Sequence, residues 1–360
     1  MSFFRRYLMP GFIFQSVVIG GGYATGRELI EFFFKAGPIG GVLGLLVSGL
    51  VFGLVLAAAF EFARVHKAHD YRKFCKALLG KYWVVYEIAF LILLILVLSV
   101  LASAAGELFH SSLALPSIVG TVTLMCFIGA LTYFGDTAIK SILTFWSILL
   151  YALYAALFVL TFYYMGDTVL QVYEEAPLSS DWLTAGVLYS GYNLAILPAV
   201  LFAVSGQKSR HEAVGSGIVA GALAVIPAIL FFVAMMSMYP KVGEVPVPSV
   251  ALINALQVPL LAIVFHIVIF GTFVETGTAL LHSVNDRIES SITDLGRSLP
   301  RRFRPLISLI LLAAAIALGT SFGLVELIAK GYSVLTFVFI AVLIVPLLTV
   351  GVWRSRNATS

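Results

Sequence analysis

The stretch IGGGYATGRE, Ile19–Glu28, lies inside an apolar run that is long enough to cross a lipid bilayer. It holds four glycines, and it ends on Arg27 and Glu28. Clustered glycines weaken a helix by roughly 1 kcal/mol each relative to alanine. Interrupted backbone at membrane depth is tolerated only where it is buried in protein or lines a watery cavity. The stretch therefore predicts a broken membrane helix with a binding site at the break.

The composition is that of an integral membrane protein. Hydrophobic residues make up 61% of the 360 residues and charged residues 11%, whereas about a quarter of a soluble domain is charged. The apolar runs reach roughly 17 to 25 residues, the length of a membrane-spanning helix, and none alternates like a barrel strand. Cys75 and Cys126 are the two cysteines, which favour neither a disulfide framework nor a metal site. We predict an all-α integral membrane fold.

The positive charges test the number of spans, because Lys and Arg gather in cytoplasmic loops. With ten spans and the N-terminus inside, 18 of the 22 Lys and Arg residues fall on the inner side. Lys35, Lys241 and Lys330 fall outside, and Arg27 lies within the first span. Both termini are therefore predicted to be cytoplasmic, and the net charge of +4 reflects this inner rim, not a nucleic-acid partner. The predicted spans lie at about residues 10–34, 38–60, 83–106, 116–134, 141–165, 183–204, 213–238, 253–283, 305–321 and 331–352.

The chain, residues 1–360, is predicted to form a single transmembrane domain of two five-helix repeats, residues 10–165 and 183–352. An odd number of spans in each half inverts the second half relative to the first. The first span of the second half holds YSGYNLAILP, Tyr189–Pro198, so special residues recur at matching places. We predict breaks near residues 20–25 and 190–193. The alternative is that the glycines permit close helix packing and that Pro198 makes a harmless kink.

The ten spans, the five-plus-five inverted repeat and the interrupted helices 1 and 6 resemble the LeuT fold of the amino acid-polyamine-cation superfamily. The stretches GGGYATGRELIEFF (residues 20–33) and LYSGYN (residues 188–193) are similar to the small bacterial YkvI-type membrane proteins. The resemblance implies a secondary transporter of the bacterial inner membrane that works by alternating access. The implied solute is a small polar molecule. Amino acids are favoured, and nucleobases, organic cations and metal ions are the open alternatives. A channel or membrane sensor built on the same scaffold is the alternative.

No enzyme is predicted, because the sequence holds no nucleophile paired with a base and no phosphate loop or HExxH-type metal motif. No obligate protein partner is evident, so the predicted partners are the solute and the lipid bilayer. Half-helix ends and freed backbone groups can bind a carboxylate or a cation. The predicted solute contacts are Gly21, Gly22 and Tyr23 in the first span and Tyr189, Gly191 and Asn193 in the sixth.

Ionisable residues inside a membrane span are functional candidates by default. Arg27 and Glu31, four residues apart, can pair along one helix face, whereas Glu28 points about 100° away from Arg27. The resemblance implies an arginine at the extracellular gate near the outer half of helix 1. Arg27 and Glu28 are therefore the predicted gate residues, and a local ion pair of Arg27 with Glu31 is the alternative.

The eighth span contains GTFVETGTALLHS, residues 271–283, whose polar residues form one helical stripe. The resemblance implies a sodium site built from helix 1 carbonyls and helix 8 hydroxyls. Gly277 stands where a second hydroxyl is expected, so the coupling ion is either sodium held partly by Glu275 or a proton carried by Glu275. The absence of a lysine deep in span 5 favours sodium slightly, and a purely structural hydrogen bond of Glu275 is the alternative. No other cofactor is predicted. The candidate residues of the coupling site are Gly22, Thr25, Glu275, Thr276 and Thr278.

Overall fold

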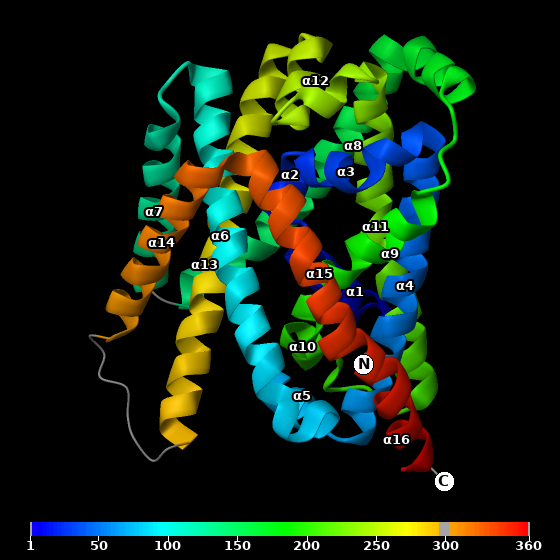
Figure 1. Ribbon diagram of the computed structural model, residues 1–360, viewed down its shortest axis with the longest axis vertical. Helices are drawn as coiled ribbons and strands as arrows, with labels where there is room; N and C mark the ends of the chain where they lie inside the picture. The colour runs from blue at the N-terminus through cyan, green and yellow to red at the C-terminus, as the bar shows by residue number, and fades with distance from the viewer. Residues whose placement is uncertain (1, 135, 295–302, 359–360) are drawn as a thin grey trace.

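The computed structural model describes residues 2–134, 136–294 and 303–358, and within these ranges the chain is helical with no strand (Figure 1). Five of the predicted inner basic residues, Lys140, Arg297, Arg301, Arg302 and Arg304, lie outside the described side chains. The helices are α1 (Met9–Val18), α2 (Gly21–Ala24), α3 (Arg27–Phe33), α4 (Gly37–Val65), α5 (Tyr71–Leu79), α6 (Trp83–Leu113), α7 (Ser117–Phe134), α8 (Asp136–Glu175), α9 (Trp182–Asn193), α10 (Leu197–Val200), α11 (Arg210–Met235), α12 (Pro248–Leu256), α13 (Pro259–Asp294), α14 (Phe303–Glu326), α15 (Ser333–Phe339) and α16 (Val352–Asn357).

Seven helical segments of the described residues are long and apolar enough to cross a membrane by length and composition. One of them, Pro305–Asn357, has 53 residues and would be about 80 Å long if straight, against a hydrocarbon core of about 30 Å. It turns at Gly323, where φ is 72°, and Figure 1 shows α14 and α15 meeting near the top and running apart. The segment Arg27–Val65 likewise contains Gly37 with φ 77°. Pro305–Asn357 therefore contains the last two predicted spans, and Arg27–Val65 contains the end of the first predicted span and all of the second.

The backbone of the first span leaves the α-helical conformation at two points. The helix α1 ends at Val18, and Ile19 has φ −75° and ψ 77°. After the single turn of α2, Gly26 adopts the left-handed conformation with φ 79° before α3 begins. A Cβ atom at Gly26 would lie 2.5 Å from the Met235 sulfur. Only glycine therefore fits this second point, because it tolerates both the positive φ and the close contact.

The sixth span behaves differently, and the predicted break at residues 190–193 is wrong. The helix α9 runs through these residues to Asn193, and a 3-10 segment, Leu194–Ile196, carries the chain into α10. The Asn193 side-chain amide donates to the Tyr189 carbonyl at 3.0 Å and the Ser190 hydroxyl to the Gly186 carbonyl at 2.7 Å. Both bonds reach back one turn and fit a helical backbone. The helix therefore tightens after Asn193 and does not open.

Gly191 and Pro198, two of the three residues on which that prediction rested together with Asn193, have other roles. A Cβ atom at Gly191 would lie 2.7 Å from the Thr336 methyl group and 3.0 Å from Ile340, so the glycine allows the last helices to approach α9. Pro198 occupies the first turn of α10, where a helix does not need the N–H group that proline lacks. The packing alternative accounts for both residues.

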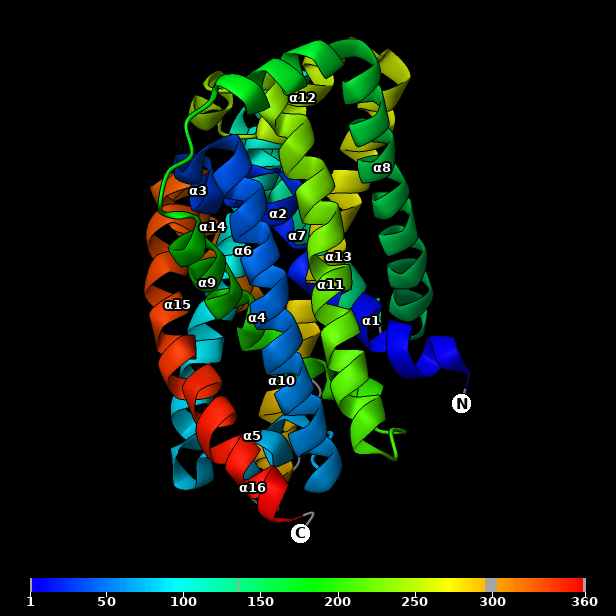
Figure 2. The same cartoon turned by 90° about the vertical axis from the view of Figure 1, so that its right-hand side faces the viewer.

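The most closely packed helix pair, α4 with α11, forms one side of the molecule, and Figure 2 shows the two running side by side. Glycines make this approach possible, because a Cβ atom at Gly221 would collide with the backbone of Gly53 and one at Gly217 with that of Ala57. The opposite side is formed by α6 packed against α7 and α14. The broken first span and α9 lie between these sides.

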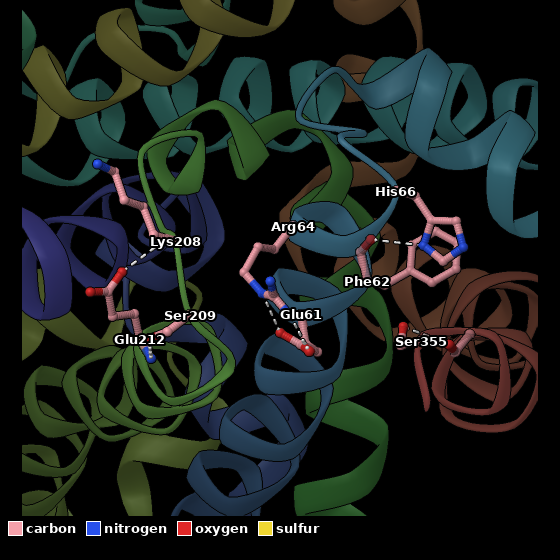
Figure 3. A network of polar contacts seen from close by, with 9 residues as sticks. Glu61, Phe62, Arg64, His66, Lys208, Ser209, Glu212 and Ser355 are labelled. Atoms are coloured by element: carbon pink, nitrogen blue, oxygen red, sulfur yellow. Dashed lines mark hydrogen bonds and ion pairs between the residues drawn. The ribbon is translucent and has the colours of Figure 1, made fainter. Parts of the chain in front are cut away.

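The predicted inner end is held by local polar contacts (Figure 3). Near the end of α4, Arg64 forms an ion pair with Glu61 at 2.7 Å. Ser209 caps α11 by accepting from the Glu212 N–H at 3.2 Å, and the Glu212 carboxylate accepts from the Lys208 N–H at 2.8 Å. The contacts of Ser209 and Glu212 satisfy backbone N–H groups at and just before the start of α11, which have no partner within the helix.

Candidate functional site

A central cavity of about 1660 Å³ begins at the break in the first span. Its deep end is lined by Gly20, Gly22, Glu28, Asn193, Tyr192 and Tyr332. Its other end is lined by residues of the predicted inner side, among them Phe4, Asp70 and Arg287. The cavity therefore connects the break with the predicted cytoplasmic side.

The deep end of the cavity holds a buried carboxyl group surrounded by rings. Glu28 is 3% exposed, and the Tyr192 hydroxyl donates a hydrogen bond to its Oε1. The Tyr192 ring stacks on Tyr332, with centroids 4.5 Å apart, and on Phe32, with centroids 5.6 Å apart. A Cβ atom at Gly22 would lie 2.8 Å from Glu28 Oε2. Glycine at position 22 therefore leaves the room that the Glu28 carboxyl group occupies.

The predicted solute contacts divide into two groups. Gly22 and Asn193 line the cavity, and Gly21 lies beside Gly22 in α2. Tyr23 and Tyr189 are buried and do not line the cavity themselves, with Tyr23 packed on Tyr154 and Tyr189 on Phe33. The Tyr23 hydroxyl has no hydrogen-bond partner among the described residues, whereas the Tyr189 hydroxyl lies next to the side chains of Glu28 and Asn193. Gly191, as noted, faces the last helices.

Arg27 ties the segment after the break to the connection between α11 and α12. Its guanidinium donates to the carbonyl of Gly243 at 2.8 Å and to that of Val245 at 3.3 Å, and it pairs with Glu31 at 2.8 Å. The Thr25 carbonyl accepts from the Ser249 N–H at 3.0 Å. Glu28, predicted as a gate residue with Arg27, points instead to the cavity. The two neighbouring charged residues thus face different surroundings, Arg27 the connection between α11 and α12 and Glu28 the cavity.

The structure splits the predicted coupling site. Glu275 and Thr276 line the central cavity, and a Cβ atom at Gly20 would lie 3.7 Å from the Thr276 methyl group. Thr278 lines a second cavity of about 800 Å³, together with Glu275 and His266. Residues two apart on a helix point about 200° away from each other, so Thr276 and Thr278 face different spaces.

The two predicted carbonyl ligands of the coupling ion already accept hydrogen bonds. The Gly22 carbonyl accepts from the Thr25 hydroxyl at 2.8 Å, and the Thr25 carbonyl accepts from the Ser249 N–H. Within the described residues, no group of three or more His, Cys, Asp and Glu side chains could hold a metal ion. A carbonyl oxygen has a second lone pair, so a cation at Gly22 would share the oxygen with Thr25.

Sequence reasoning missed Tyr192, Tyr332 and Arg287. Tyr192 stood in the quoted LYSGYN stretch, but Tyr332 is distant in sequence and carries no local signal. Arg287 is 3% exposed, pairs with Glu87 at 3.0 Å and lies over the Tyr71 ring at 3.8 Å. It forms the wall of the cavity near the inner side, where partial burial also lowers the pKa of His69 and favours its neutral form at pH 7.

No family model matches the chain. It is 25% identical over 336 residues to the membrane protein YkvI of Bacillus subtilis (strain 168), and the match covers 92% of both chains. A sodium-coupled sialic acid symporter, solved in a substrate-bound outward-open state, has a TM-score of 0.66 with 14% identity, covering 94% of this chain and 79% of the symporter. The chain has the LeuT fold. The resemblance to this fold and to YkvI is therefore confirmed.

Two further structures share the LeuT fold with this chain. MhsT in complex with L-phenylalanine has a TM-score of 0.57 with 14% identity, covering 97% of both chains. A manganese transporter from Eremococcus coleocola has a TM-score of 0.56 with 15% identity, covering 96% of this chain and 78% of the transporter. These three structures are a sialic acid symporter, a protein in complex with L-phenylalanine and a manganese transporter, so the LeuT fold does not by itself select the solute.

Proposed function

We propose that the chain is a secondary transporter of ten spans in two inverted five-helix repeats. It moves a small polar solute, with amino acids as the first class, through the central cavity of the bacterial inner membrane. Both termini lie in the cytoplasm. The observation that supports this proposal best is the cavity that runs from the glycine-rich break toward the predicted inner side. Structural neighbours with the same fold include a sodium-coupled symporter and MhsT bound to L-phenylalanine.

In this proposal the cavity and the contacts of Arg27 represent a state that is open to the inside and closed to the outside. The Arg27 guanidinium holds the segment after the break against Gly243 and Val245. Removing these bonds with Arg27→Ala should shift spin-label distances across the outer side toward the open state. An unchanged distance distribution would reduce Arg27 to a local ion pair with Glu31.

The second part of the proposal is that transport is coupled to an ion gradient. Sodium is favoured over the proton as the coupling ion. Glu275 and Thr276 line the cavity beside the break and are the residues that respond to the ion. Thr278, which faces the second cavity, contributes less.

Uptake of a radiolabelled amino acid mixture into proteoliposomes tests both parts. An imposed sodium gradient should drive accumulation, and both Glu275→Gln and Thr276→Ala should weaken the dependence on sodium. If a pH gradient drives accumulation instead, Glu275→Gln should abolish it while Thr276→Ala should not. Solute that only equilibrates, without accumulating under either gradient, would indicate a channel. Full gradient-driven uptake by both variants would exclude this coupling site.

A further inference from the structure

The Glu28 carboxyl group lacks a compensating charge from the protein. It lines the cavity, is 3% exposed and accepts a hydrogen bond from Tyr192. Among the described side chains, no lysine, arginine or histidine pairs with it, and the guanidinium of its neighbour Arg27 is bound to Glu31. Ionising a buried carboxyl group that has no cationic partner costs several kcal/mol, so its charged form requires a nearby cation. Inside a membrane such a group is a functional candidate.

The surroundings of Glu28 fit an organic cation better than a hydrated metal ion. Tyr192 and Tyr332 line the same end of the cavity, and aromatic rings attract ammonium groups. A hard metal ion would need about six oxygen ligands. The nearby Gly22 carbonyl already accepts from the Thr25 hydroxyl, and no metal-binding cluster occurs in the described part of the chain.

We propose that the transported solute carries a cationic nitrogen that pairs with Glu28 at the deep end of the cavity. This inference rests on the proposed function and names the solute class of the same site. The class includes amino acids bound through their ammonium group, organic amines and quaternary ammonium compounds. Binding of such a solute would supply the positive charge that the protein does not place beside Glu28. The Tyr192 hydroxyl would hold the carboxylate in position for it.

The test uses pairs of compounds of similar shape, one with a cationic nitrogen and one without. Suitable pairs are choline with dimethylbutanol, putrescine with butanediol and L-phenylalanine with phenylpropionate. Thermal stability and equilibrium binding are measured on the purified full-length protein in detergent. At least one nitrogen cation should raise Tm and bind, while its partner compound should not. Glu28→Gln should weaken that binding at least ~10-fold, as expected from the loss of a charged hydrogen bond.

Two variants serve as controls. Glu326→Gln makes the same substitution at an exposed carboxylate that pairs with Lys330 at 2.6 Å, and it should bind the cation with native affinity. Glu28→Asp keeps the charge one methylene further back, so it should keep the preference for the cation with weaker affinity. It replaces Glu28→Gln if that variant does not fold. In that case, loss of the preference in a folded Glu28→Asp protein counts against the proposal.

A folded native protein that binds none of the cations, or binds only neutral or anionic compounds, would overturn the inference. Native cation affinity in Glu28→Gln would also overturn the inference. This holds even if the variant loses its response to a pH gradient, because Glu28 would then act in coupling and not in solute binding. The outcome for the transporter proposal is separate. Gradient-driven uptake of a neutral or anionic solute independent of Glu28 would leave transport intact and overturn this inference. Cation binding that needs Glu28 but gives no uptake would support this inference and overturn the transporter proposal.

Discussion

The first and sixth spans contain the same helix-weakening residue types, yet only one of them breaks. In the first span the backbone leaves the helix at Ile19 and again at Gly26. In the sixth span the chain stays right-handed through Gly191, Leu194 and Pro198 and changes only from an α-helix to a 3-10 helix. The difference lies in what the glycines meet. Gly26 has a positive φ that other residues avoid, whereas Gly191 is helical and touches a neighbouring helix.

The comparison shows that glycine content alone does not predict a break in a membrane helix. A glycine can relax the backbone or can remove a side chain from a helix contact, and the sequence of one chain does not separate the two roles. In this protein the relaxed backbone lies beside the cavity with its buried carboxyl group, and the packing glycine lies away from the cavity.

The largest effect is expected from bulk at the first break. Gly22→Leu places a side chain where Glu28 Oε2 and Ile328 now lie, at 2.8 and 3.3 Å from the Cβ position. Solute binding should fall by at least ~100-fold, equivalent to about 2.7 kcal/mol, while the protein remains folded by circular dichroism. Gly129→Ala is the control, since Gly129 lines neither cavity and its Cβ atom would meet Leu312 at an ordinary 3.4 Å, so this variant should bind with native affinity. Native affinity in Gly22→Leu would move the site elsewhere.

The next largest effect is a loss of stability, expected at Gly26, where the first span leaves the helix for the second time. Gly26→Ala combines a left-handed backbone with a contact to the Met235 sulfur, so unfolding should become easier by about 3 kcal/mol. The measurement is chemical unfolding in detergent micelles. Gly53→Ala, in the helical α4 and 3.5 Å from Ile218, should leave stability unchanged or raise it slightly. Equal stability of both variants would mean that the bend at Gly26 is not required.

A smaller effect is expected at the packing glycine of the sixth span. Gly191→Ala should lower stability by about 1 to 2 kcal/mol through overpacking against Thr336, and it should leave solute affinity near native. Thr336→Ser removes the methyl group that lies 2.7 Å from the Cβ position. The double variant should therefore regain part of the lost stability. A loss of solute binding in Gly191→Ala with unchanged stability would instead support the original prediction that Gly191 contacts the solute.

The smallest effect is expected at Pro198. Because the proline sits in the first turn of α10, Pro198→Ala should change stability by less than about 1 kcal/mol and should leave the helix intact. Thermal unfolding and solute binding, compared with the native protein, are sufficient to check this. A large loss of solute affinity would show that the sixth span needs an interruption at this residue.

The sequence was sufficient to predict the membrane class, the helical fold and the weak point of the first span. These features depend on composition, on hydrophobic length and on a glycine cluster, all of which are local. The sixth span was mispredicted because the role of Gly191 depends on Thr336, 145 residues away in the chain. No local pattern contains that contact.

The candidate site could be predicted only in part for the same reason. Glu28 was recognised as an unusual charge, but its partner Tyr192 is 164 residues away and Tyr332 comes from the last part of the chain. Helix geometry explains why Thr276 and Thr278 face different cavities. Tertiary packing, however, decides which face of α13 contacts the first span. Tertiary contacts thus decide which of the predicted residues share a cavity.

The central claim is that the break in the first span is the solute site and that Glu28 is its anchor. The most direct test is a structure of the protein with the tightest-binding nitrogen cation from the compound pairs. The account predicts the solute between Gly22 and Tyr192, with its nitrogen within about 4 Å of the Glu28 carboxylate, the usual limit for an ion pair. Solute bound in the second cavity beside His266, with the space at Glu28 empty, would contradict the account.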